Sequence, residues 1–150
     1  MATKYKGTTK ELKTLNAFIN LMRAANSLET RISRNLDKYG LTTSQFGILE
    51  ALYHLGSMSQ KELGIKILKS GGNITKVIDN LEKKKLIKRR RNINDRRLYN
   101  IDLTEEGKKL IINIFPQHVG ELVKEFSVLN ESEMDQLRKL ARYVGKQKRD

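Results

Sequence analysis

RRRNINDRRLYNIDLTEEG, residues 89–107, carries five arginines in its first nine positions, on both sides of an Asn-Ile-Asn-Asp turn. The turn separates two short segments, LIKRRRN and RLYNIDL, that contain β-branched or aromatic residues, a pattern typical of a β-hairpin. In the second segment Tyr99, Ile101 and Leu103 alternate with polar residues, as a half-buried strand requires. An extended anionic partner would explain the paired arginines, but a solvated loop would also tolerate them. The remaining sequence is needed to distinguish an anionic partner from a solvated loop.

The segment before the hairpin, GGNITKVIDNLEKKK, predicts an amphipathic helix over residues 71–85. Its apolar residues recur at helical spacing and define one face, which consists of Ile74, Val77, Ile78 and Leu81. By 3.6-residue geometry the opposite face presents polar side chains to solvent or to a partner. These are Lys76, Asp79, Asn80 and Lys83, with Asn73 and Thr75 near the N-terminal edges.

Capping patterns divide the remaining sequence into helices. Capping boxes, in which a short polar residue is followed three positions later by Glu or Gln, occur at Thr8/Glu11, Thr42/Gln45, Ser59/Glu62 and Asn130/Glu133. Thr104 precedes Glu105 and Glu106, which favour a helix N-terminus. The predicted order is a long helix over about residues 9–38, three further helices, the hairpin and two helices. No repeat or linker divides the chain, so residues 1–150 are interpreted as a single domain.

Composition restricts the class of protein. The chain has 150 residues, of which 38% are hydrophobic and 31% charged, which is typical of a globular protein. No apolar run approaches the roughly 18 residues that a membrane span needs, and the N-terminus lacks the apolar region of a signal peptide. We therefore expect a cytoplasmic protein with no membrane partner. The absence of cysteine excludes disulfides and thiolate metal ligands.

Positive charge is concentrated in the middle of the chain. The net charge is +13, and residues 61–100 hold 13 of the 30 basic residues but only 4 of the 17 acidic ones. Such a basic segment is typical of nucleic-acid binding. A solvated basic surface is the alternative, and charge alone does not separate the two.

Residues 41–111 resemble the MarR family of bacterial winged helix-turn-helix regulators. The resemblance is carried by NITKVIDNLEKKKLIKR, residues 73–89, followed by NDRRLYNIDLTEEG, residues 94–107. It implies a mainly α fold with a small β-hairpin wing. The winged helix-turn-helix core would span about residues 41–107, with dimerisation helices over about residues 9–38 and 108–147. One departure is Lys85, where the family usually has glycine at the turn between helix and strand.

The resemblance also implies which residues contact DNA. The N-terminal residues of a recognition helix read base edges in the major groove, and flanking residues hold phosphates. We expect this of Asn73, Thr75 and Lys76, with Lys69 and Ser70 on phosphate; the alternative is an ordinary polar helix face. In the family's wing an aspartate orients an arginine in the minor groove, which corresponds here to Asp95 and Arg97, with Arg96 on phosphate. Arg89 is expected to brace the fold through carboxylates, and Asp79 to pair with a cation.

The expected function is a sequence-specific transcriptional regulator, more often a repressor in this family, bound as a homodimer to a pseudo-palindromic operator in double-stranded DNA. A constitutive architectural DNA-binding protein without an effector is the alternative. The resemblance implies a pocket for a small aromatic or phenolic ligand, with candidate lining residues Phe18, Met22, Tyr53, His54, Phe115 and His118. No phosphate loop, nucleophile motif or metal-binding pattern is present, so we expect neither an enzyme nor a cofactor or metal.

Overall fold

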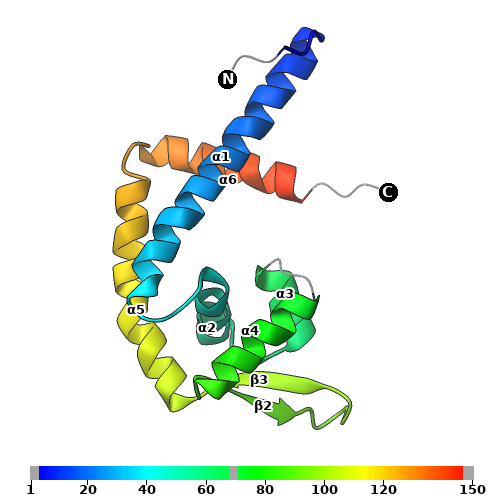
Figure 1. Cartoon of the computed structure of the whole chain (residues 1–150), viewed down its shortest axis with the longest axis vertical. Coiled ribbons are helices and arrows are strands. Elements are labelled where there is room, and N and C mark those ends of the chain that lie inside the picture. Colours follow the sequence, from blue (N-terminus) through cyan, green and yellow to red (C-terminus); the bar gives the residue numbers. More distant parts are fainter. Residues whose placement is uncertain (1–3, 68–70, 147–150) are drawn as a thin grey trace.

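The computed structural model describes residues 4–67 and 71–146, a mainly helical chain with a small antiparallel sheet at its lower end in Figure 1. The elements in chain order are α1 (Thr9–Asp37), α2 (Thr43–Leu55), β1 (Met58–Ser59), α3 (Gln60–Ile67), α4 (Gly71–Lys83), β2 (Ile87–Arg91), β3 (Tyr99–Leu103), α5 (Glu105–Glu125) and α6 (Glu131–Gly145). The predicted fold class, mainly α with a β-hairpin wing, is confirmed.

The four capping boxes are present as the sequence predicted. At the start of α2, the Thr42 hydroxyl accepts a hydrogen bond from the backbone N–H of Gln45, whose side chain accepts one from the Thr42 N–H, both at 3.1 Å. The same reciprocal pair begins α1, α3 and α6. Each cap satisfies backbone donors that have no partner within the helix, a contribution of about 1 kcal/mol.

The sheet has one strand more than the hairpin that the sequence predicted. Strands β2 and β3 pair antiparallel from Ile87 opposite Leu103 to Arg91 opposite Tyr99. On the other edge of β3 lies β1, in which Met58 is opposite Ile101, so the strand order is β1-β3-β2. The prediction missed β1 because two residues are too few to show alternation. This strand ties the start of α3 to the base of the wing.

The turn from α4 to β2 contains a left-handed lysine. Helix α4 ends at Lys83, two residues before the predicted end, and Lys85 has φ 59°. The N–H of Leu86 donates to the carbonyl of Leu81 at 3.1 Å, and that of Lys85 to the carbonyl of Glu82 at 2.9 Å. This is the Schellman arrangement, in which glycine usually occupies the left-handed position. Replacing the family's usual glycine with Lys85 therefore leaves the turn geometry intact.

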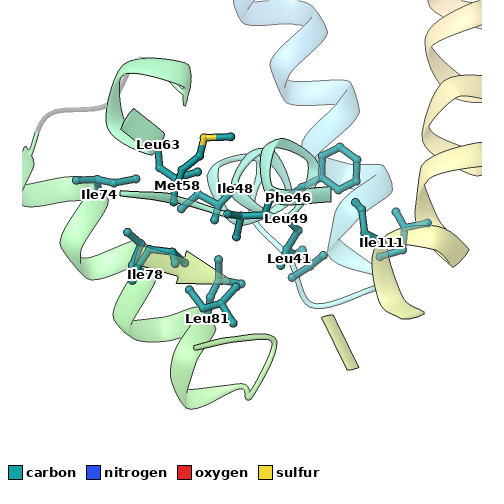
Figure 2. Packing of buried hydrophobic residues seen from close by; sticks show 14 of the residues in the cluster. Leu41, Phe46, Ile48, Leu49, Met58, Leu63, Ile74, Ile78, Leu81 and Ile111 are labelled. Atoms are coloured by element: carbon teal, nitrogen blue, oxygen red, sulfur yellow. The ribbon is translucent and has the colours of Figure 1, made fainter. Parts of the chain in front are cut away.

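The buried core lies between α2, α4 and the sheet (Figure 2). Ile48 and Leu49 of α2 meet Ile78 and Leu81 of α4, all essentially inaccessible to solvent. As predicted, Ile74 is buried with them, and Val77 packs against the cluster at its edge. Burial of this stripe fixes the rotation of α4, so that its polar residues face outward.

The terminal helices extend away from this core. Arg31 of α1 contacts Glu125 of α5 with Nε 2.6 Å from Oε2, and the Tyr39 hydroxyl donates to the Gln117 side chain. Within the described residues no side chain of α6 is buried, although α6 carries large apolar residues. Figure 1 shows α1 and α6 projecting beyond the part that contains α2, α3 and α4. Much apolar surface is therefore left uncovered on these helices.

Candidate nucleic-acid interface

The exposed face of α4 presents most of the residues that the sequence singled out there. Asn73, Thr75 and Lys76 are exposed, while Asp79 and Asn80 are half-buried along the same helix. Lys69 and Ser70, the predicted phosphate ligands, lie outside the described residues. A concave surface of about 280 Å³ runs between this face and the start of α2, lined by Thr42, Ser44, Gln45, Asn73, Lys76, Val77 and Asn80.

Gln60 is a residue of this face that the sequence analysis missed. It begins α3, and its Nε2 donates to the Thr75 hydroxyl at 2.6 Å. The bond joins residues 15 positions apart and depends on the angle between α3 and α4. A one-dimensional pattern does not contain that angle. Thr75 is thus held by α3 as well as by its own helix.

Arg89 braces the interface from behind, as the sequence predicted. Its guanidinium contacts Asp79 Oδ1 at 2.5 Å and Glu82 Oε1 at 2.7 Å, and its backbone N–H donates to Glu82 Oε2 at 3.2 Å. Burial lowers the pKa of Arg89, but hydrogen bonds to Asp79 and the charge of Glu82 outweigh it, so the pKa is raised. The expected cation beside Asp79 is therefore Arg89, which pairs with the acidic side chain on the outer face of α4.

The next two arginines are also occupied on the protein. Arg90 donates to Asp102 across the hairpin from Nε at 2.8 Å, and this hydrogen bond is the main cause of the lowered pKa of Asp102. Arg91 lies over the ring of Tyr99, 5.8 Å from its centroid. Arg89, Arg90 and Arg91 thus contact other side chains of the folded chain, whereas Arg96 and Arg97 are exposed at the hairpin tip.

The wing tip holds Arg97 in a fork with Asp95. The Arg97 guanidinium donates from Nε to Asp95 Oδ1 and from Nη2 to Oδ2, both at 3.1 Å, and its backbone N–H also donates to Oδ1. The side-chain hydrogen bonds lower the pKa of Asp95, so the carboxylate is charged at neutral pH. Even in this pair the Arg97 side chain is 89% exposed. Arg96 is exposed and forms no ion pair with any of the residues that the structure describes.

The α4 face and the wing tip lie on one side of the molecule. In Figure 1 the N-terminal end of α4 and the tip between β2 and β3 are both at the right-hand edge of the lower part. The N-terminal end of α4 and the wing tip, which carries Arg96 and Arg97, therefore lie toward the same edge of the molecule in this view. A long polyanion would contact both features at once.

Four of the six predicted ligand-pocket residues come together at the junction of α2 and α5. The His54 ring lies 4.7 Å from the Phe115 ring and 5.0 Å from the Tyr53 ring, measured between centroids. His118 is 4.5 Å from Phe46 and 6.5 Å from Phe115, and burial lowers its pKa. The other two, Phe18 and Met22, are exposed on α1, and among the described residues Phe18 forms no ring contact with this group.

A cavity of about 530 Å³ opens beside His54, between α1, α2 and α3. Its polar lining includes Glu29, Glu50, His54 and Lys66, and its apolar lining includes Ala51, Leu55 and Ile67. This volume lies within the usual range for small-molecule sites. Among the described residues, no group of three or more His, Asp or Glu side chains is placed to hold a metal ion, and no helix is long and apolar enough to cross a membrane.

Comparison with known sequences shows which proteins this chain is similar to. Residues 41–99 match the model of the MarR family. The chain is 38% identical over 133 residues to the HTH-type transcriptional regulator MhqR of Bacillus subtilis, an alignment that covers 89% of this chain and 92% of MhqR.

Solved structures show the same architecture. The fold is similar to that of Sco3205, a MarR family transcriptional regulator from Streptomyces coelicolor that was solved in complex with DNA. The TM-score is 0.83 and the sequence identity is 22%, and the alignment covers 97% of this chain and 92% of Sco3205. It is also similar to NadR solved in complex with 4-hydroxyphenylacetate, with a TM-score of 0.76, 25% identity, and coverage of 99% and 100%.

Proposed function

This chain belongs to the MarR family of transcriptional regulators, and from that premise we propose that it represses transcription as a homodimer bound to a pseudo-palindromic operator. A small aromatic or phenolic ligand would weaken that binding. Members of the family are regulators and not enzymes, which confirms the prediction that the chain is not an enzyme. The proposed role requires access to the chromosome, which in bacteria lies in the cytoplasm.

The observation that carries the proposal is the Asp95–Arg97 fork at an exposed wing tip. The two hydrogen bonds from the Arg97 guanidinium to the Asp95 carboxylate both measure 3.1 Å, yet the Arg97 side chain remains 89% exposed. Such a guanidinium is held in one orientation by Asp95 and is still accessible to DNA. Arginine suits a narrow minor groove because it is planar, weakly hydrated and drawn to the negative potential there. Arg96 beside it would contact phosphate.

Helix α4 would read the major groove from the same side. Asn73, Thr75 and Lys76 are exposed near its N-terminal end, the part of a recognition helix that reaches base edges. Lys69 and Ser70 precede the helix and would hold phosphate there. The arrangement is supported by the similarity of this fold to that of Sco3205, which was solved with DNA.

The exposed apolar residues of the terminal helices support the homodimer. On α6, Leu140, Tyr143 and Val144 are 61–65% exposed, and on α1 Phe18 is 60% exposed. Contiguous apolar surface of this kind marks an interface, and in a twofold dimer each copy would cover the other's helices. The winged core over about residues 41–107 would then be joined to dimerisation helices over about residues 9–38 and 108–147. Sedimentation of a 17.3 kDa monomer at micromolar concentration would contradict this.

The aromatic residues at the α2–α5 junction and the cavity beside them support an effector. NadR was solved with 4-hydroxyphenylacetate, a phenolic acid, and this chain aligns over 99% of its length with that structure. A ligand near His54 and Phe115 would change the contact between α2 and α5. This change would alter the spacing of the two winged parts in a dimer. By linkage it would lower DNA affinity. A panel of aromatic compounds that shifts neither operator affinity nor melting temperature would favour the constitutive binder.

Selection of bound duplexes from a random pool tests the DNA-binding proposal directly. A sequence-specific regulator should enrich a pseudo-palindrome with half-sites about 34 Å apart and bind it roughly 10³-fold more tightly than random duplex. An architectural protein would bind both duplexes at similar concentrations. Recovery of no motif, with equal affinity for all duplexes, would overturn the regulator proposal.

A further inference from the structure

Ile93 projects from the wing tip into solvent. It is 88% exposed, more than any other large hydrophobic residue among those the structure describes. A singly exposed apolar side chain is ordinary on a protein surface. This residue differs in its position, because it stands between the arginines of β2 and the Asp95–Arg97 fork.

Two nested turns hold Ile93 in this position. The Asn92 side-chain oxygen accepts hydrogen bonds from the backbone N–H groups of Asn94 at 2.8 Å and Asp95 at 3.2 Å. The Asn92 N–H donates to the Leu98 carbonyl at 2.9 Å, and the Leu98 N–H to the Asp95 carbonyl at 3.0 Å. The backbone on both sides of Ile93 is thus fixed by hydrogen bonds, and its exposure is a property of an ordered tip.

The surroundings of Ile93 combine apolar and cationic groups. Leu98 is 50% exposed on the same tip, while Arg96 and Arg97 extend beside it. A DNA minor groove offers matching chemistry, since its floor and phosphates attract the guanidinium groups and its walls are the apolar faces of deoxyribose rings. Apolar side chains in the minor groove are a recurrent feature of DNA-binding proteins.

We propose that Ile93 packs against the deoxyribose wall of the groove that Arg97 enters and sets how deeply the wing inserts. The inference rests on the proposed function, since it requires the wing to meet DNA. The contact removes apolar surface from water on both partners and involves no charge. Ile93 therefore contributes affinity that does not depend on counterion release, unlike the arginines beside it.

The test compares Ile93→Ala with Arg96→Ala on the duplex recovered by selection, with affinities measured by anisotropy between 50 and ~300 mM salt. Loss of most of the buried side chain should weaken binding about five- to tenfold at every salt concentration. The slope of log affinity against log salt should equal that of the parent, whereas Arg96→Ala should flatten it by about one unit. Ile93→Val, which keeps a branched apolar group, should recover most of the affinity.

Ile65→Ala is the matched control, because it removes the same side chain and Ile65 is 65% exposed on α3, outside the proposed DNA-contact and dimerisation residues. It should bind as the parent does, and both variants should keep the parent's melting temperature and sedimentation. Binding of Ile93→Ala within twofold of the parent, or a change in its oligomeric state, would overturn the inference while leaving the regulator proposal standing. If the parent itself binds no duplex, both are wrong.

Discussion

The carboxylate of Asp95 receives both side-chain hydrogen bonds of the Arg97 fork, from Nε and from Nη2, each at 3.1 Å. Two parallel bonds to one carboxylate fix the plane of the guanidinium as well as its position. An exposed arginine without this partner would sample many rotamers, and ordering it on DNA would cost conformational entropy. Asp95 is therefore expected to strengthen DNA binding although its own charge repels phosphate.

Asp95→Ala should lower operator affinity even though it raises the net charge by one. The expected loss is smaller than that of Arg97→Ala, because the arginine remains and only its orientation is released. Asp95→Asn should have an affinity between those of the parent and Asp95→Ala, since an amide oxygen still accepts from the Arg97 backbone but the carboxylate pair is lost. Titration of a fluorescent operator measures all three variants. Asp37→Ala, which removes an acidic residue at the end of α1, controls for net charge; tighter binding by Asp95→Ala would mean that the wing is only a charged surface.

Arg97→Ala and Arg96→Ala should weaken binding in different ways. Loss of Arg97 should cost about 1–3 kcal/mol on an operator with an A·T-rich sequence under the wing, and less on a G·C-rich one. Loss of Arg96 should weaken binding to every duplex alike and flatten the salt dependence by about one unit of slope.

Substitution of guanine by inosine distinguishes contacts in the minor groove from contacts in the major groove. Replacing G·C by I·C under the wing removes the minor-groove amino group but keeps the major-groove pattern of guanine. The Arg97 contribution should then rise towards its value on A·T pairs, and the Arg96 contribution should stay constant. If the loss of affinity caused by Arg97→Ala is the same on G·C and I·C duplexes, Arg97 does not enter the minor groove.

Arg89→Ala should destabilise the fold, whereas Arg91→Ala should not. Arg89 is 23% exposed at its side chain and bonds two carboxylates of α4, so its removal leaves Asp79 and Glu82 without their cation. Charged hydrogen bonds of this kind are worth about 1.5–3 kcal/mol. Arg91 is exposed, and its side-chain contacts among the described residues are with Tyr99 alone, a long hydrogen bond of 3.4 Å to the hydroxyl and a contact with the ring, so its loss should stay within about 0.5 kcal/mol. Urea unfolding of both variants measures the difference, and equal losses would contradict the bracing role of Arg89.

The contrast between these arginines shows what the sequence could and could not predict. Helical spacing placed Ile74, Ile78 and Leu81 in the core because each pattern is local to one helix. The partner of Arg89 was predicted only as an unnamed carboxylate, since Asp79 and Glu82 reach it across the α4–β2 turn.

The features that the sequence did not predict depend on how separate elements are packed. The bond from Gln60 to Thr75 depends on the angle between α3 and α4, and β1 exists only because β3 lies beside Met58. Neither the Gln60–Thr75 bond nor the β1–β3 pairing produces a periodic pattern in the sequence from which it could be predicted. The wing fork between Asp95 and Arg97 was expected from the resemblance to the MarR family, whose Asp-x-Arg wing pattern these two residues match.

The pair of Arg90 and Asp102 should make stability depend on pH in the acidic range. Hydrogen bonding from Arg90 lowers the pKa of Asp102 in the folded state below its unfolded value of about 3.9. A depressed carboxyl pKa contributes stability that is present above the unfolded pKa and is lost as pH falls through the folded pKa. Parent and Asp102→Asn should therefore differ in unfolding free energy at pH 7 and converge as the pH falls through the lowered folded pKa of Asp102. Chemical denaturation across that range provides the test, and a difference that persists at pH 2 would assign the effect to packing.

Substituting Lys85 by glycine should stabilise the protein, although the Lys85 side chain is exposed and forms no hydrogen bond or ion pair with the described residues. Lys85 has φ 59°, a left-handed conformation that costs an L-residue about 1–2 kcal/mol and glycine almost nothing. Part of this is offset by the greater freedom of glycine in the unfolded chain, so the expected gain is about 0.5–1 kcal/mol. Lys83→Gly is the matched control: it is the last residue of α4, two positions earlier, where the backbone is helical and glycine should cost up to about 0.5–1 kcal/mol. Opposite signs for the two glycines in thermal unfolding are the expected result, and a loss at both positions would show that Lys85 is not strained in the turn.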